Sequence, residues 1–112
     1  MGIRLDRRLF DDTLHAPHLL DLEVTQVLRR YVRQRLVTAD RASQALDDLS
    51  DLPLTRYPHD VLVRRIWPLL DNITAYDAAY IALAEVLDAT LVTSDRRLRQ
   101  IRGHDAQVEV VG

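Results

Sequence analysis

The pattern of apolar and polar positions predicts two amphipathic helices in the first half of the chain. From Leu20 to Leu36, apolar residues recur at spacings of three and four, and arginines fill much of the opposite face. A narrower apolar stripe, Ala42 to Leu49, predicts a second helix that Thr38 or Asp40 would cap and that ends near Ser50.

The second half alternates strand-like and helix-like segments. The predicted elements are a short strand within 52–57, a helix over 59–70 that Pro68 ends or kinks, a helix from Thr74 to about Leu87, a strand over 90–93, a short arginine-rich helix and a last strand over 108–111. Leu62, Ile66 and Leu69 should face inward, and Trp67, Tyr76 and Tyr80 occupy core-like helical positions. Strands that alternate with helices indicate an α/β fold with a mostly parallel sheet.

Length and composition fit one compact domain over residues 1–112, since 47% of the residues are hydrophobic. The sequence contains neither a run of about 20 apolar residues nor a secretory signal, which makes the cytoplasm the expected compartment and excludes a membrane partner. Without cysteine, any metal site must use oxygen or imidazole ligands. The net charge of −2 lacks the basic excess of a protein that coats nucleic acid. All 15 basic residues are arginine, which suits phosphate contacts but also reflects a codon bias.

Asp77 and Asp95 stand at the two ends of an alanine-rich, apolar run. About 13 helical residues carry the chain about 20 Å from Asp77, and about five strand residues return it by about 16 Å. The two carboxylates should therefore lie near each other, at the carboxyl edge of the sheet. Each acid, like Glu23, is also an ordinary helix-start residue that caps a helix or favours its dipole.

The joint placement of Glu23, Asp77 and Asp95 carries more information than any one of them. Three acids at helix starts near one sheet edge would repel one another unless a cation binds between them. Oxygen ligands alone favour Mg²⁺ or Mn²⁺. We expect the three carboxylates within about 10 Å of one another and at least one raised carboxyl pKa in the metal-free protein.

These residues carry a resemblance to a known family. The segment "TAYDAAYIALAEVLDATLVTSDRRL" resembles the carboxyl-terminal half of PIN-domain nucleases, particularly VapC-type toxins of toxin-antitoxin pairs, and "LHAPHLLDLEVTQVLRR" resembles their first acidic helix. The resemblance implies a PIN-like three-layer fold, with helices flanking the sheet, and Mg²⁺- or Mn²⁺-dependent hydrolysis of RNA. It implies that Asp77 is a principal metal ligand, that Asp95 is a further acid and that Glu23 completes the cluster, with the hydroxyl of Thr93 or Ser94 beside them. It also implies a homodimer and a tight complex with an antitoxin.

The amino terminus departs from this resemblance. Members of the family begin with a strand that ends in an Asp, whereas "MGIRLDRRLF" contains no such strand and is similar to the second half of the helix that follows it. We expect Asp6 on a solvated face rather than among metal ligands. The first strand and one of four acids are then missing, which predicts an unfilled place in the sheet beside 90–93. Either the start is truncated or misassigned, or the protein is a reduced member.

The leading hypothesis is a metal-dependent endoribonuclease toxin in which Arg96 or Arg97 holds the RNA backbone. A catalytically impaired module that binds an antitoxin or RNA without cleaving is the alternative. An unrelated helical interaction domain is a third hypothesis, which a parallel sheet that gathers the three acids would exclude.

Overall fold

The computed structural model describes residues 2–4 and 14–111 of the 112-residue chain. They belong to two compact units, one formed by Leu19–Pro53 and the other by the described residues before and after that segment. Asp6, expected on a solvated face, lies outside the described residues. Among the residues described, no helix is long and apolar enough to cross a membrane.

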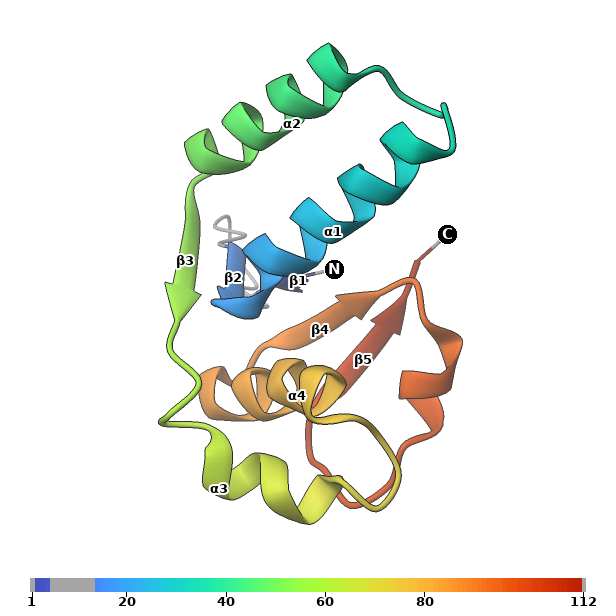
Figure 1. Ribbon diagram of the computed structural model, residues 1–112. Coiled ribbons are helices and arrows are strands. Elements are labelled where there is room, and N and C mark those ends of the chain that lie inside the picture. Colours follow the sequence, from blue (N-terminus) through green and yellow to red (C-terminus); the bar gives the residue numbers. More distant parts are fainter. Residues whose placement is uncertain (1, 5–13, 112) are drawn as a thin grey trace. The chain divides into compact units, whose positions relative to one another are not determined.

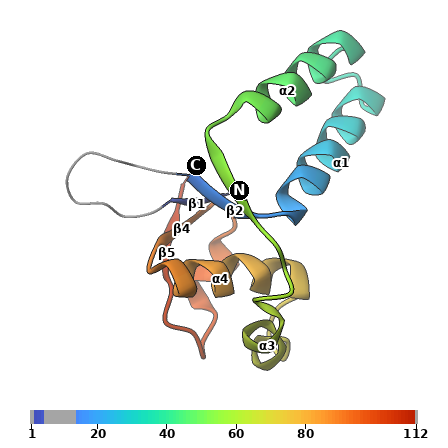
Figure 2. The same cartoon turned by 90° about the vertical axis from the view of Figure 1, so that its left-hand side faces the viewer.

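The unit Leu19–Pro53 is a pair of helices, α1 (Leu19–Arg33) and α2 (Ala39–Asp51), that lie side by side (Figure 2). The predicted cap is present, because the hydroxyl of Thr38 accepts a hydrogen bond of 3.0 Å from the backbone N–H of Arg41. Both predicted amphipathic helices are thus confirmed.

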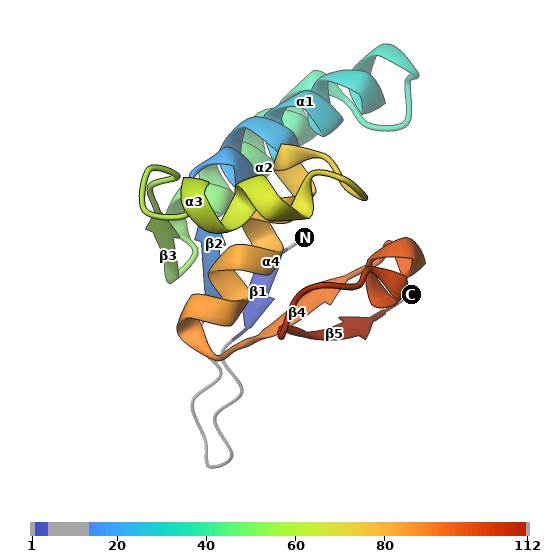
Figure 3. The same ribbon diagram turned by 90° about the horizontal axis from the view of Figure 1, so that it is seen from below.

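The other unit contains a sheet that, within the described residues, has five strands. These are β1 (Gly2–Arg4), β2 (Leu14–Pro17), β3 (Leu54–Tyr57), β4 (Thr90–Thr93) and β5 (Gln107–Val110), in the order β3-β2-β1-β4-β5. The pairs β2/β3 and β4/β5 are parallel, and β1 is antiparallel to both of its neighbours. Figure 3 shows β4 and β5 side by side. All strands except β1 therefore run in one direction, which confirms the mostly parallel sheet of a mixed α/β fold.

The expectation of an unfilled place beside β4 is wrong. Strand β1 pairs there with β4, with Ile3 opposite Leu91, and on its other side with β2, with Ile3 opposite His15. Residues 2–4 are extended rather than helical, because the backbone groups of two flanking strands would otherwise lack partners. Although β1 fills the position, its residues Gly2, Ile3 and Arg4 bring no carboxylate to it.

Helix α4 (Ala75–Leu87) is the central helix of this unit, and its residues from Ala78 to Ala84 are all buried. It contacts β1, β2 and β4, and it also contacts α3 (Val63–Ile66) and the 3₁₀ turn η1 (Trp67–Leu69). Figure 2 shows α4 between the strands and α3. Alanines allow the close approach that burial on two sides requires, which explains a helix that is apolar nearly all round.

The helix predicted over 59–70 is shorter and changes type. Leu62, Ile66 and Leu69 are buried as expected. The α-helical part ends at Ile66 and continues as the 3₁₀ turn η1, which contains Pro68. Proline lacks the N–H that a continuing α-helix would use, so the change of type follows from the sequence.

The assignment of three aromatic residues to the core is correct only for Tyr80, which is fully buried. Trp67 and Tyr76 are 76% and 67% exposed. Tyr76 lies in the first turn of α4, ahead of the buried stretch that begins at Ala78. The apolar pattern of the helix therefore extends beyond the part that the sheet and α3 cover.

The close packing of α4 gives a first prediction. Ala82→Leu should lower the free energy of unfolding by about 1–3 kcal/mol or more, because it inserts three carbons into a fully buried position. Ala75→Leu makes the same substitution at an exposed position of the same helix and should change stability by about 0.5 kcal/mol or less. Urea denaturation of the two variants measures the difference, and equal stabilities would contradict this packing.

Candidate active site

A hydrogen bond of its backbone N–H holds Asp77 in the first turn of α4. The hydroxyl of Thr74, the N-cap residue, accepts a hydrogen bond of 3.2 Å from the N–H of Asp77. This is the hydroxyl half of the predicted capping box. The carboxylate of Asp77 is left partly exposed at the helix start, where the dipole favours a negative charge.

Asp95 is positioned by the end of strand β4. The hydroxyl of Thr93, a residue only 1% exposed, accepts a hydrogen bond of 3.0 Å from the N–H of Asp95. Asp95 in turn caps the 3₁₀ helix η2 (Arg96–Gln100), because its Oδ1 accepts a hydrogen bond of 3.0 Å from the N–H of Arg97. The buried Thr93 thus fixes the direction in which Asp95 leaves the sheet, whereas Ser94 is exposed.

The connection between α4 and β4 directs the start of the helix and the end of the strand to the same edge of the sheet. Asp88 ends α4 in the left-handed conformation, with φ of 50°, and Ala89 leads directly into β4 (Figure 1). The strand therefore runs back along the helix that precedes it. Beside this edge is a cavity of about 370 Å³, and its lining includes Asp77, Thr74, Arg97 and Leu98.

Arg97 pairs with Asp95 and lines the same cavity as Asp77. Its guanidinium donates to both carboxylate oxygens of Asp95, with Nη2 2.7 Å from Oδ2 and Nε 3.0 Å from Oδ1. The hydrogen bonds to Asp95 raise the pKa of Arg97, and the charges of Asp95 and, more weakly, of Asp77 add to that effect.

The expected raised pKa is not found at Asp95. The hydrogen bonds from the side chain and then the backbone of Arg97 hold the pKa of Asp95 below its usual value. We expected crowded acids to oppose ionisation, but the nearest charged group is a cation, which favours the ionised form.

Glu23 lies on α1, in the other unit, and is partly exposed. Within the described residues of either unit, no three His, Asp or Glu side chains gather closely enough to hold a metal ion. The cluster of Glu23, Asp77 and Asp95 therefore stays a prediction. The donors of the sheet unit, two carboxylates with the hydroxyls of Thr93 and Ser94 nearby in sequence, have the oxygen chemistry that Mg²⁺ and Mn²⁺ prefer.

Comparison with protein families decides the identity of the fold. The family model described as "PIN domain" matches residues 3–104. The chain belongs to the PIN-domain family. The resemblance stated from the sequence is thereby confirmed.

Relatives of this PIN domain include three proteins of Mycobacterium tuberculosis. It is 45% identical to ribonuclease VapC9 over 101 residues, 89% of this chain and 79% of that one. It is 44% identical to ribonuclease VapC1 over 98 residues, 87% of this chain and 74% of that one. Ribonuclease VapC12 is 36% identical over 110 residues, 98% of this chain and 85% of its own.

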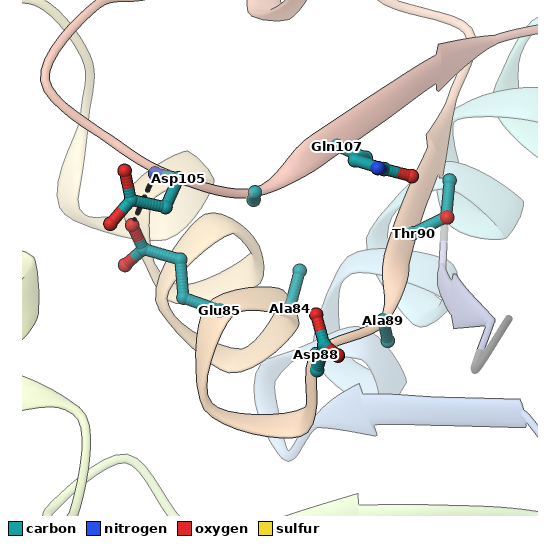
Figure 4. A pocket seen from close by; sticks show the side chains of 8 residues that line it. Ala84, Glu85, Asp88, Ala89, Thr90, Asp105 and Gln107 are labelled. Carbon is teal, nitrogen blue, oxygen red and sulfur yellow. Dashed lines mark hydrogen bonds between the residues drawn. The ribbon is translucent and has the colours of Figure 1, made fainter.

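A second cavity of this PIN domain, of about 310 Å³, lies at the opposite end of α4, and its lining includes the acids Glu85, Asp88 and Asp105 (Figure 4). Glu85 accepts hydrogen bonds of 2.6 and 2.8 Å from Arg65 and one of 2.7 Å from the N–H of Asp105. Arg65 also donates to the carbonyl oxygen of Gly103. Glu85 thus joins α3, α4 and the loop before β5. Sequence analysis missed this ion pair, since no helical or strand spacing relates residues 65 and 85.

The environment of Glu85 gives a second prediction. Glu85→Gln should lower the free energy of unfolding by about 1–3 kcal/mol at pH 7, because Arg65 and the N–H of Asp105 lose a charged acceptor. The hydrogen bond from Arg65 lowers the pKa of Glu85 in the folded protein. The contribution of Glu85 to stability is therefore complete above about pH 4.3, its pKa in the unfolded chain. It disappears as the pH falls through the lower pKa of Glu85 in the folded protein.

Urea denaturation from pH 7 down to about pH 3 measures this effect. The stabilities of the wild type and Glu85→Gln should converge as the pH falls from about 4.3, the unfolded pKa, through the lower pKa of folded Glu85. Asp71→Asn, at an exposed residue, serves as the control and should stay within about 0.5 kcal/mol of the wild type at pH 7. A stability difference that grows as the pH falls would contradict the proposed role of Glu85.

Proposed function

We propose that this PIN domain is a VapC-type endoribonuclease toxin that hydrolyses RNA phosphodiester bonds with Mg²⁺ or Mn²⁺. The observation that carries the proposal is the 45% identity to a ribonuclease over 89% of the chain. The positions of Asp77 and Asp95 support it, because α4 and β4 direct both acids to one edge of the sheet, beside one arginine.

In this proposal Asp77 and Asp95 are metal ligands, and Glu23 is the further acid that the family resemblance implies. The bound ion would supply charge neutralisation and an activated water for attack on the scissile phosphate. The chain supplies the positions of these ligands, through the Thr74 cap for Asp77 and through Thr93 for Asp95. Arg96 and Arg97, both exposed, would contact the RNA backbone.

The partner of such a toxin is an antitoxin protein, and a homodimer is the assembly that the resemblance implies. Light scattering of the purified chain, alone and with its antitoxin, tests both assignments. A monomer that forms no complex would contradict them without bearing on cleavage.

The alternative is a module that binds an antitoxin or RNA without cleaving. Two observations favour it: the central strand β1 has no acid, and Arg97 engages both oxygens of Asp95. The two functions differ in a single property, since only the enzyme cleaves RNA with Mg²⁺ and loses that activity in EDTA.

A third prediction tests the enzyme directly. Asp77→Asn should lower RNA cleavage by about 100-fold or more, because the charge that holds the metal contributes several kcal/mol to the transition state. Asn keeps the shape of Asp and its place beside the Thr74 cap, so the fold should persist. The rate of cleavage of a labelled structured RNA measures the effect, with circular dichroism as the check on folding.

Asp88→Asn is the matched control at the other end of the same helix. Asp88 is exposed and in the left-handed conformation, which Asn also adopts readily. The control should keep wild-type cleavage. Equal losses in the two variants, or cleavage that persists in EDTA, would refute the proposed metal site at Asp77.

A further inference from the structure

The carboxylate of Asp95 is engaged on both oxygens by a single residue. Oδ1 accepts from Nε and from the backbone N–H of Arg97, each at 3.0 Å. Oδ2 accepts from Nη2 at 2.7 Å and from Nε at 3.2 Å. This is the forked geometry in which arginine binds a carboxylate most specifically.

Such a pair opposes a divalent cation at the same carboxylate. The guanidinium carries a full positive charge about 3 Å from the oxygens that would ligate the ion, and like charges at that range repel strongly. Three N–H groups of Arg97 already donate to the two oxygens, and Nε–H is shared between both. Arg97 and a metal ion therefore compete for Asp95.

The side chain of Arg97 can move away from Asp95 without disturbing the core. This side chain is 82% exposed, whereas that of Asp95 is 22% exposed, and the backbone N–H of Asp95 donates to the hydroxyl of the buried Thr93. An exposed ion pair contributes little to stability, so breaking it has a small cost. The part of the pair that moves is the arginine, and the carboxylate stays in place.

We propose that Arg97 is the internal counter-ion of Asp95, which orients this carboxylate in the metal-free protein and must release it before Asp95 can ligate a divalent cation. The inference rests on the proposed metal role of Asp95. It makes Arg97 a positioning residue that sets how much Mg²⁺ or Mn²⁺ the protein needs.

Calorimetric titration of the full chain with Mn²⁺ alone tests the inference, with Arg97→Gln and Arg96→Gln as matched variants. Both remove one positive charge from neighbouring exposed positions, but only Arg97 pairs with Asp95. Arg97→Gln should lower the Kd for Mn²⁺ by about five-fold or more, which corresponds to about 1 kcal/mol. Arg96→Gln should lower it by less than about two-fold, through the long-range loss of charge alone.

Arg97→Lys provides a second measure. Lysine keeps the charge but not the planar fork, so its Kd for Mn²⁺ should fall between those of the wild type and Arg97→Gln. Equal Kd values for Arg97→Gln and Arg96→Gln, or weaker Mn²⁺ binding by Arg97→Gln, would overturn the inference.

Asp95→Asn separates this failure from failure of the proposed function. The variant should bind Mn²⁺ at least about ten-fold more weakly, since an ionised ligand is lost. If Asp95→Asn weakens Mn²⁺ binding while Arg97→Gln and Arg96→Gln have equal Kd values, the proposed metal site is supported and only the proposed role of Arg97 is wrong. If Asp95→Asn binds Mn²⁺ like the wild type, Asp95 is no ligand and the proposed site itself is wrong.

Discussion

The burial of α4 on two sides is the constraint on which the rest of the sheet unit depends. Its residues from Ala78 to Ala84 are enclosed between the strands on one side and α3 and η1 on the other. A helix held in this way cannot rotate or slide without opening cavities or forcing clashes in a densely packed interior. The direction of α4, and with it the place of Asp77 at its start, is therefore set mainly by apolar packing, to which the ion pair between Arg65 and Glu85 adds.

The same packing determines where Asp95 lies. Asp88 and Ala89 turn the chain tightly from α4 into β4, and the strand returns along the helix to the edge where the helix began. The buried hydroxyl of Thr93 then orients the backbone of Asp95. Apolar burial thus positions the backbones of both acidic residues. The electrostatics of the site then act only on their carboxylates. Arg97, which is exposed and pairs with Asp95, is the part of the site that can change.

Much of this arrangement could be predicted from the sequence, because each element has a local signal. The apolar stripes gave α1 and α2, the threonine caps gave the starts of α2 and α4, and the β-branched run gave β4. Helix and strand rise alone predict that the start of α4 lies near the end of β4. Membership of the PIN-domain family was predicted from the resemblance of the segments around Glu23 and from Asp77 to Asp95, which no single helix-start acid would reveal.

The errors concern features without a local signal. Tyr76 and Trp67 match a helical apolar pattern, but whether a position on that pattern is covered depends on how far the neighbouring elements reach. The strand β1 is a short segment with little pattern of its own, and it is extended because its neighbours β2 and β4 supply the hydrogen bonds. The pKa of Asp95 depends on the rotamer of Arg97, which brings a cation to an acid that we expected to be crowded by other acids. Contacts such as that between Arg65 and Glu85 appear only once two helices are packed.

The central proposal is that Asp77, at the start of α4, and Asp95, after β4, ligate the same metal ion. Paramagnetic broadening by Mn²⁺ in the amide NMR spectrum of the full chain tests it most directly, since signals near the bound ion broaden first. We predict that the amides of Asp77 and Asp95 lose intensity together at the lowest Mn²⁺ concentration. Early loss at Glu85 and Asp105, with the signals of Asp77 and Asp95 unchanged, would contradict the account.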